Sequence, residues 1–188
     1  LPVFSYVSDS VAIVNWSTNE PADALIRYWT DGSADIQQIG RSSLNVDHQL
    51  TLSDLAAGTN YHFEVISDDV SGNRLTVSGL AFTTDSAADT IAPSFVVAPV
   101  IENLLPGKAS LSFTTDEMTQ VQVRYGLSIA SMDWQSGEEG FSTAHSIVIA
   151  SLDPGLNYSF EIDIIDPTGN RTTSPVLALI VDADSDGD

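Results

Sequence analysis

Apolar and polar residues alternate with a period of two along most of the chain. Successive side chains of a β-strand point to opposite faces, so this alternation predicts strands that bury one face. No segment shows a sustained period of 3.6 residues with capping residues, so we expect almost no helix. The alternating segments are residues 12–16, 24–28, 48–52 and 61–65, and then residues 109–113, 121–125, 145–149 and 158–162.

The second set of segments repeats the first after a shift of 97 residues. Arg27 and Tyr28 correspond to Arg124 and Tyr125, and 125 − 28 = 97. A repeat of this length matches a module that can fold alone rather than a solenoid unit. We therefore expect one domain at residues 1–88, a second at residues 89–182 and an acidic tail at residues 183–188. The same shift relates His48 to His145, Gly58 to Gly155, Tyr61 to Tyr158, and Gly72-Asn-Arg74 to Gly169-Asn-Arg171.

Turn-forming residues separate the alternating segments. Pro154-Gly155 and Thr168-Gly-Asn170 are examples in the second copy, and both are sequences that favour tight turns. Short strands separated in this way are typical of a sandwich of two antiparallel sheets. The predicted fold class is all-β, with one sandwich in each copy.

A motif near the end of each copy resembles a known structural feature. Leu55-x-x-Gly58-Thr-x-Tyr61 and Leu152-x-Pro-Gly155-x-x-Tyr158 resemble the tyrosine corner, in which a tyrosine hydroxyl bonds back to the backbone of the preceding connection. Nearly the whole chain is similar to tandem fibronectin type III domains, especially those of secreted prokaryotic proteins and the N-terminal domain of purple acid phosphatases. The resemblance implies two immunoglobulin-like Greek-key β-sandwiches from an extracellular or cell-surface protein, without catalytic activity. Ala57, Leu156 and Phe113 depart from the usual family residues by changes in packing only.

The charge of the chain limits its partners. Its 26 acidic and 6 basic residues give a formal net charge of −20, which disfavours nucleic acid and anionic membrane surfaces. No apolar run approaches the roughly 20 residues needed to span a bilayer, so we expect no direct membrane insertion. Cysteine is absent, so the stability of each domain must come from packing rather than from disulfides.

The acidic tail is the clearest candidate for binding a metal ion. Asp182, Asp184, Asp186 and Asp188 alternate with other residues, and Gly187 lies between the last two. Alternating carboxylates followed by glycine match the opening of a calcium-binding loop. Calcium is the one cofactor we expect, and two alternatives stay open: weak or absent binding by this fragment, and a solvated acidic linker.

The histidines do not form a recognisable catalytic motif. His48 follows Asp47, but His145 follows Ala144, so an acid–histidine pair does not recur along the sequence. We expect both to be half-buried and to bond to the backbone. A Gly-x-Ser-x-Gly elbow and a metal-binding histidine pair are both missing from the sequence, so we expect no enzyme activity.

The outer sheet face of the first domain is predicted to bind a protein partner or a second copy of the chain. If Tyr28 and Val65 point inward, then Leu25, Trp29 and Ile66 point outward from the same sheet. Their counterparts in the second copy are Gln122, Gly126 and Asp163. The alternatives are scattered apolar surface residues without a role, and coverage by an edge strand at residues 33–40.

The sequence is compatible with three functions. The first is a structural or adhesive spacer or a protein-interaction module of a larger protein. The second is a self-associating subunit of an extracellular filament or surface layer. The third is a polysaccharide-binding accessory region of a secreted hydrolase, in which Trp29 and Trp134 could stack on sugar rings. Glycosylation sequons begin at Asn15, Asn157 and Asn170, and Asn15 and Asn157 are expected to face away from the core.

Overall fold

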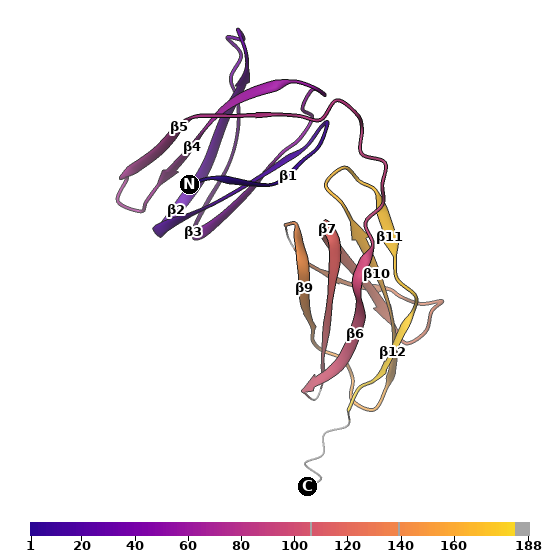
Figure 1. Ribbon diagram of the computed structural model, residues 1–188. Helices are drawn as coiled ribbons and strands as arrows, with labels where there is room; N and C mark the ends of the chain where they lie inside the picture. The colour runs from indigo at the N-terminus through magenta and orange to yellow at the C-terminus, as the bar shows by residue number, and fades with distance from the viewer. Residues whose placement is uncertain (106, 139, 183–188) are drawn as a thin grey trace. The chain divides into compact units, whose positions relative to one another are not determined.

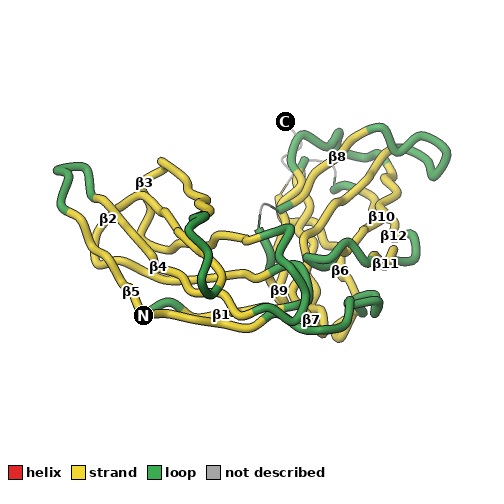
Figure 2. Tube along the Cα trace, turned by 90° about the horizontal axis from the view of Figure 1, so that it is seen from above, coloured by secondary structure: helices red, strands yellow, loops and turns green. Residues whose placement is uncertain are grey.

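The computed structural model describes residues 1–105, 107–138 and 140–182, which form strands and turns and contain no helix. They fall into two compact units, Leu1–Asp89 and Thr90–Asp188 (Figure 1). The division lies between Asp89 and Thr90, so Asp89 belongs to the first unit. Figure 2 shows strands through most of each unit, so the all-β prediction is confirmed.

The first unit is built around two long strands that each contribute to both layers of a sandwich. Residues 12–17 of β2 pair with residues 47–52 of β3, and residues 22–28 pair with residues 37–45 after an irregularity. One layer is completed by β1 and the other by β4 and β5. The strands are β1 (Val3–Val7), β2 (Ala12–Thr30), β3 (Gln37–Leu52), β4 (Asn60–Asp68) and β5 (Arg74–Thr83).

The second unit repeats this arrangement with its two layers as separate sheets. The first part of β7 pairs with β6 and β9, while its last part pairs with β8 and β10. Both β11 and β12 pair with β10. The strands are β6 (Phe95–Leu105), β7 (Lys108–Gly126), β8 (Trp134–Gly137), β9 (Ser142–Ile149), β10 (Asn157–Ile165), β11 (Arg171–Thr173) and β12 (Leu177–Ile180).

Each unit has its own hydrophobic core, formed by the inward residues of the alternating segments. Trp16 and Phe63 lie in the core of the first unit, and Phe113 and Phe160 occupy the equivalent positions in the second. Because the side chains alternate between faces, the same strands leave a second set of residues on the outside of each sandwich. Candidate functional residues are therefore found either on these outer faces or where a strand bends between the layers.

Candidate functional site

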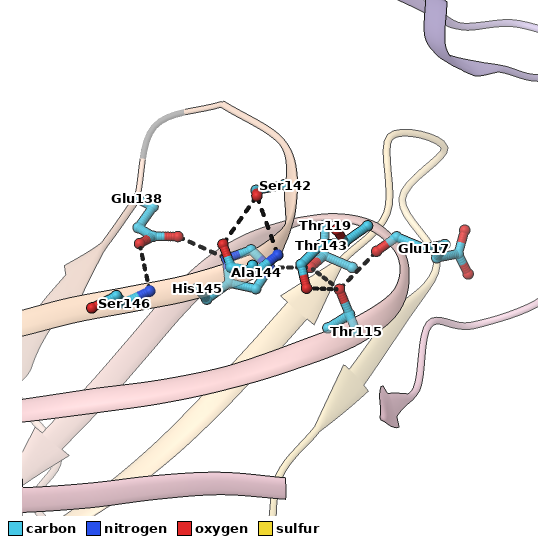
Figure 3. Close-up of polar contacts among 9 residues, drawn as sticks. All are labelled: Thr115, Glu117, Thr119, Glu138, Ser142, Thr143, Ala144, His145 and Ser146. Carbon is cyan, nitrogen blue, oxygen red and sulfur yellow. Dashed lines mark hydrogen bonds and ion pairs between the residues drawn. The ribbon is translucent and has the colours of Figure 1, made fainter. Parts of the chain in front are cut away.

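A polar cluster of the second unit surrounds His145 (Figure 3). His145 lies on β9, and its side chain is 1 % exposed. Its Nδ1 lies 2.7 Å from Oε2 of Glu138, and its Nε2 lies 2.9 Å from Oγ1 of Thr119. A carboxylate accepts hydrogen bonds, so Nδ1 donates to Glu138, and Nε2 shares a second hydrogen bond with the Thr119 hydroxyl. The connectivity is that of an acid–histidine–hydroxyl triad.

Burial prevents this triad from acting on a substrate. Thr119 is 0 % exposed, and its hydroxyl lies 3.3 Å from that of Thr115, which donates to the Glu117 carbonyl oxygen at 2.7 Å. A nucleophile must reach the atom that it attacks, and the Thr119 oxygen cannot do so. The cluster instead connects the bend of β7 to β9 and to the segment after β8, because Glu138 Oε1 also accepts from the Ser146 amide at 3.2 Å.

The first unit contains a shorter version of this cluster. His48 is buried and stacks on Trp16, with ring centroids 5.0 Å apart, as His145 stacks on Phe113 at 4.8 Å. Its Nε2 lies 3.2 Å from Oγ1 of Thr18, which is the counterpart of Thr115. Burial lowers the pKa of His48, partly offset by Asp47 and Asp23.

Two substitutions between the copies account for the difference. Glu138 corresponds to Arg41, and Thr119 corresponds to Ala22, so the second unit has gained a partner on each side of its histidine. The prediction of half-buried histidines bonded to the backbone is wrong, because both are buried and bond to side chains. Of these two buried histidines, His145 is the one whose ring bonds to an acid, and that acid is Glu138 rather than its neighbour in the sequence.

A second polar cluster lies on the outer face of β10. Asp163 is 1 % exposed, contacts Arg171 through Oδ2, and accepts a hydrogen bond from Thr173 at 2.6 Å. Arg124 Nε lies 3.4 Å from the same Oδ2 without hydrogen-bond geometry. Burial raises the pKa of Asp163, but Arg171, Thr173 and the charge of Arg124 more than offset this, so the pKa is lowered overall.

Replacing Asp163 with Asn is expected to lower the unfolding free energy of the second unit by about 1–3 kcal/mol at neutral pH. The two arginines are partly exposed, so solvent reduces the cost of leaving them unpaired. A lowered folded-state pKa means that the stabilisation is present above the unfolded pKa of about 3.9 and is lost as the pH falls through the folded value. Urea unfolding at neutral and acidic pH measures both effects.

The control for this change is Asp68→Asn in the first unit. Asp68 pairs with Arg74 in a more exposed ion pair, with 2.6 Å between Arg74 Nη2 and Asp68 Oδ2. Exposed pairs contribute little, so we expect a much smaller loss. The difference in unfolding free energy between Asp163→Asn and the parent chain should shrink in acid. An unchanged difference would contradict the lowered pKa of Asp163.

The outer face of the first unit carries four rows of residues across β2 and β4. Leu25 pairs with Ile66, Arg27 with Glu64 and Trp29 with His62, and the next outward positions are Asp31 and Asn60. The Arg27 Nη1 and Glu64 Oε1 atoms are 3.5 Å apart.

The expectation that Ile66 is exposed is wrong, because it is 3 % exposed. It lies on a central strand between Leu25 of β2 and Thr76 of β5, and neighbours on both sides cover it. Leu25 and Trp29 are half-buried. Residues 37–40 do form an edge strand beside β2, in line with the alternative of coverage.

The predicted calcium ligands lie almost wholly outside the described residues. Asp182 is exposed, and its amide donates to Asn103 Oδ1 at 3.2 Å. Asp184, Asp186 and Asp188 lie beyond the described ranges. Calcium binding by the tail therefore stays a prediction.

The three sequons have different surroundings. Asn157 is exposed, whereas Asn15 Nδ2 donates to Ser5 Oγ at 2.6 Å on the outer face of β2. Asn170 Nδ2 donates to Asp166 Oδ2 at 2.8 Å and so lies within a tight loop. A glycan on Asn170 would remove this contact, so Asn157 is the sequon whose modification costs the fold least. Glycosylation itself stays a prediction at all three.

Asp166 was missed as an organiser of this loop. Its Oδ1 accepts the amides of Thr168 and Asn170 at 2.8 and 2.9 Å, and Asp69 Oδ1 accepts those of Ser71 and Asn73 in the first unit. The repeated Asp-x-x-Gly-Asn-Arg sequence was the signal that could have found both.

Each sandwich contains a tyrosine corner. The Ala56 amide donates to Tyr61 Oη at 2.8 Å, and the Asp153 amide donates to Tyr158 Oη at 3.1 Å. The same two-layer pairing and the same corner occur in both copies. Each unit has the fibronectin type III fold.

The chain is similar to parts of two known proteins. No family model matches the chain. The chain is 28 % identical over 186 residues to Endoglucanase B of Cellulomonas fimi, covering 93 % of this chain but 17 % of that protein. It is also similar to a crystal structure of chicken CNTN1 FN1-FN3 domains, with a TM-score of 0.45, 14 % identity, and coverage of 94 % of this chain and 63 % of that chain. The chain therefore spans only part of the length of either protein. Within the described ranges, no helix is long and apolar enough to cross a membrane.

Proposed function

We propose that this tandem fibronectin type III chain is a non-catalytic extracellular module of a larger protein, acting as a spacer or protein-interaction module. The observation that carries the proposal is that both polar clusters serve the fold. The groups around His145 bond within their cluster, those around Asp163 bond within theirs, and each cluster holds strands together. The buried Thr119 hydroxyl argues against nucleophilic chemistry at the triad-like cluster. The resemblance to domains of secreted prokaryotic proteins supports an extracellular location.

The acidic surface supports a role in keeping modules apart. A net charge of −20 makes copies of the chain repel one another in dilute salt. A divalent cation or high salt would screen that repulsion. We propose that the acidic tail from Asp182 to Asp188 supplies the calcium-binding segment in the longer protein.

A second candidate is a polysaccharide-binding accessory region of a secreted hydrolase. The similarity to Endoglucanase B along 93 % of this chain favours it. The chain covers a small share of that protein, so the similarity supports an accessory role rather than an enzymatic one.

Size-exclusion chromatography with light scattering, across salt and calcium concentrations, tests the spacer proposal. A spacer should remain monomeric at every protein concentration. Growth in mass with concentration would instead support a filament or surface-layer subunit. Calorimetric titration of calcium into the chain, with and without residues 182–188, tests the tail, and equal heats would remove it as a site.

A further inference from the structure

Two rows on the outer face of the first unit form a mixed aromatic and polar cluster. The Trp29 and His62 rings, on the paired strands β2 and β4, stack with centroids 6.1 Å apart and planes inclined by 24°. Asp31 Oδ1 lies 2.5 Å from His62 Nε2, and Asp31 Oδ2 accepts from Asn60 Nδ2 at 3.3 Å. An aromatic surface is thus bordered by a carboxylate, an amide and an imidazole. We infer that Trp29, Asp31, Asn60 and His62 form a binding site for a neutral polysaccharide.

The chemistry of these four side chains fits a sugar ring. A pyranose presents an apolar face of C–H groups and a rim of hydroxyls, so it needs a flat aromatic surface and nearby donors and acceptors. Trp29 is half-buried and supplies the surface. The Asp31 side chain is 74 % exposed and can accept from hydroxyls while its contacts with His62 and Asn60 fix its orientation.

The protonation state of Asp31 suits this role. The hydrogen bonds from His62 and Asn60 lower the pKa of Asp31, so its carboxyl group stays ionised below the usual range. An ionised carboxylate is a stronger hydrogen-bond acceptor than a protonated one. Asp31 therefore remains an acceptor in mildly acidic solution.

The charge of the chain selects a neutral ligand. The chain has 26 acidic and 6 basic residues, so it repels anionic polysaccharides. The neighbouring row of this outer face holds Arg27 and Glu64, which pair with each other. The cluster itself carries the ionised Asp31 carboxylate, so it favours recognition of hydroxyls over binding of an anionic sugar.

The second unit shows that the fold does not require three of these four residues, while Asn60 is retained there as Asn157. At the positions of Trp29, Asp31 and His62 it has Gly126, Ser128 and Ser159. Gly126 and Ser159 still pair in register on β7 and β10, so the sheet is maintained without an aromatic ring or a carboxylate there. A structural need common to both sandwiches therefore does not explain the cluster.

This inference rests on the second candidate function and assigns it a site and a ligand class. The probes are hydroxyethylcellulose in affinity electrophoresis and cellohexaose in calorimetry, both neutral β-linked glucans. Trp29→Ala is expected to weaken binding by about tenfold or more, since stacking and burial of the indole are lost. His62→Ser, which installs the residue of the second unit, is expected to weaken it severalfold.

Matched controls separate the site from general effects. Trp134→Ala removes the exposed tryptophan of the second unit and should leave binding unchanged. Amide chemical-shift changes on adding cellohexaose should be confined to the first unit, and thermal unfolding should show that Trp29→Ala is folded.

The outcomes are distinct. If the parent chain is retained by hydroxyethylcellulose and Trp29→Ala is retained equally, the site is overturned while the accessory function stands. Absence of retention of the parent chain would overturn both and leave the spacer function. Equal binding to polygalacturonate, an anionic polysaccharide, would overturn the neutral ligand class.

Discussion

Replacing Phe160 with Ala is expected to lower the unfolding free energy of the second unit by about 3–5 kcal/mol. Phe160 is among the largest fully buried side chains, and its ring packs against those of Tyr125 and Tyr158, with centroids 5.8 and 6.3 Å away. Truncation removes these contacts and leaves a cavity between two sheets whose strands are fixed by backbone hydrogen bonds. Partial collapse of the site would place the cost at the lower end of this range.

Calorimetric unfolding measures the effect. A loss of 3 kcal/mol or more in a domain of this size lowers the unfolding temperature by more than about 10 °C. The matched change is Phe63→Ala, because Phe63 occupies the equivalent position in the core of the first unit and contacts Phe4 and Phe82. Each substitution should shift one transition only. A shift of both transitions by either substitution would contradict the assignment of separate cores.

The period-two pattern was sufficient to predict the core residues. Phe63 and Phe160 could be assigned to the interior because inward residues recur at every second position and agree between the two copies. The tyrosine corner was also predictable, since its hydrogen bond is local, spanning five residues from Ala56 to Tyr61. Local spacing and repetition carry this kind of information.

The period-two pattern was insufficient where the exposure of a residue depends on side chains of the adjacent strands. Ile66 does lie on the outward face, as alternation predicts, but the strands on both sides of β4 determine that it is buried. Asp163 occupies the same position in the second unit and is equally buried, because Arg171 and Thr173 of β11 contact it. The direction of a side chain follows from its own strand, whereas its burial follows from the residues next to it.

The contact between Glu138 and His145 could not be predicted from the repeat. Glu138 lies seven residues before His145, in the connection between the two sheets, and its counterpart in the first copy is Arg41. A charge reversal at equivalent positions gives no signal of a shared role. The difference between Ala22 and Thr119 gave no signal either, because only the bend of β7 places Thr119 beside Nε2 of His145.

Replacing His145 with Ala is expected to lower the unfolding free energy of the second unit by about 2–4 kcal/mol. The change removes a ring stacked on Phe113 and leaves the Glu138 carboxylate and the buried Thr119 hydroxyl without their histidine partner. Polar groups that lose a buried partner bear the cost of their desolvation. Urea unfolding followed by the fluorescence of Trp134, the tryptophan of this unit, measures the loss.

His48→Ala provides the internal comparison, because it removes an equivalent stacked ring where the acid and the additional threonine are absent. Thr18 keeps its hydrogen bond to the Glu20 carbonyl oxygen at 2.7 Å, so this change should cost less than His145→Ala. Glu138→Gln retains the side-chain shape but exchanges the carboxylate for an amide, and we expect about 1 kcal/mol of loss from the weaker hydrogen bond to Nδ1. Equal costs for His48→Ala and His145→Ala, together with no effect of Glu138→Gln, would mean that the ring stacking alone stabilises both units and that the additional partners of His145 contribute nothing.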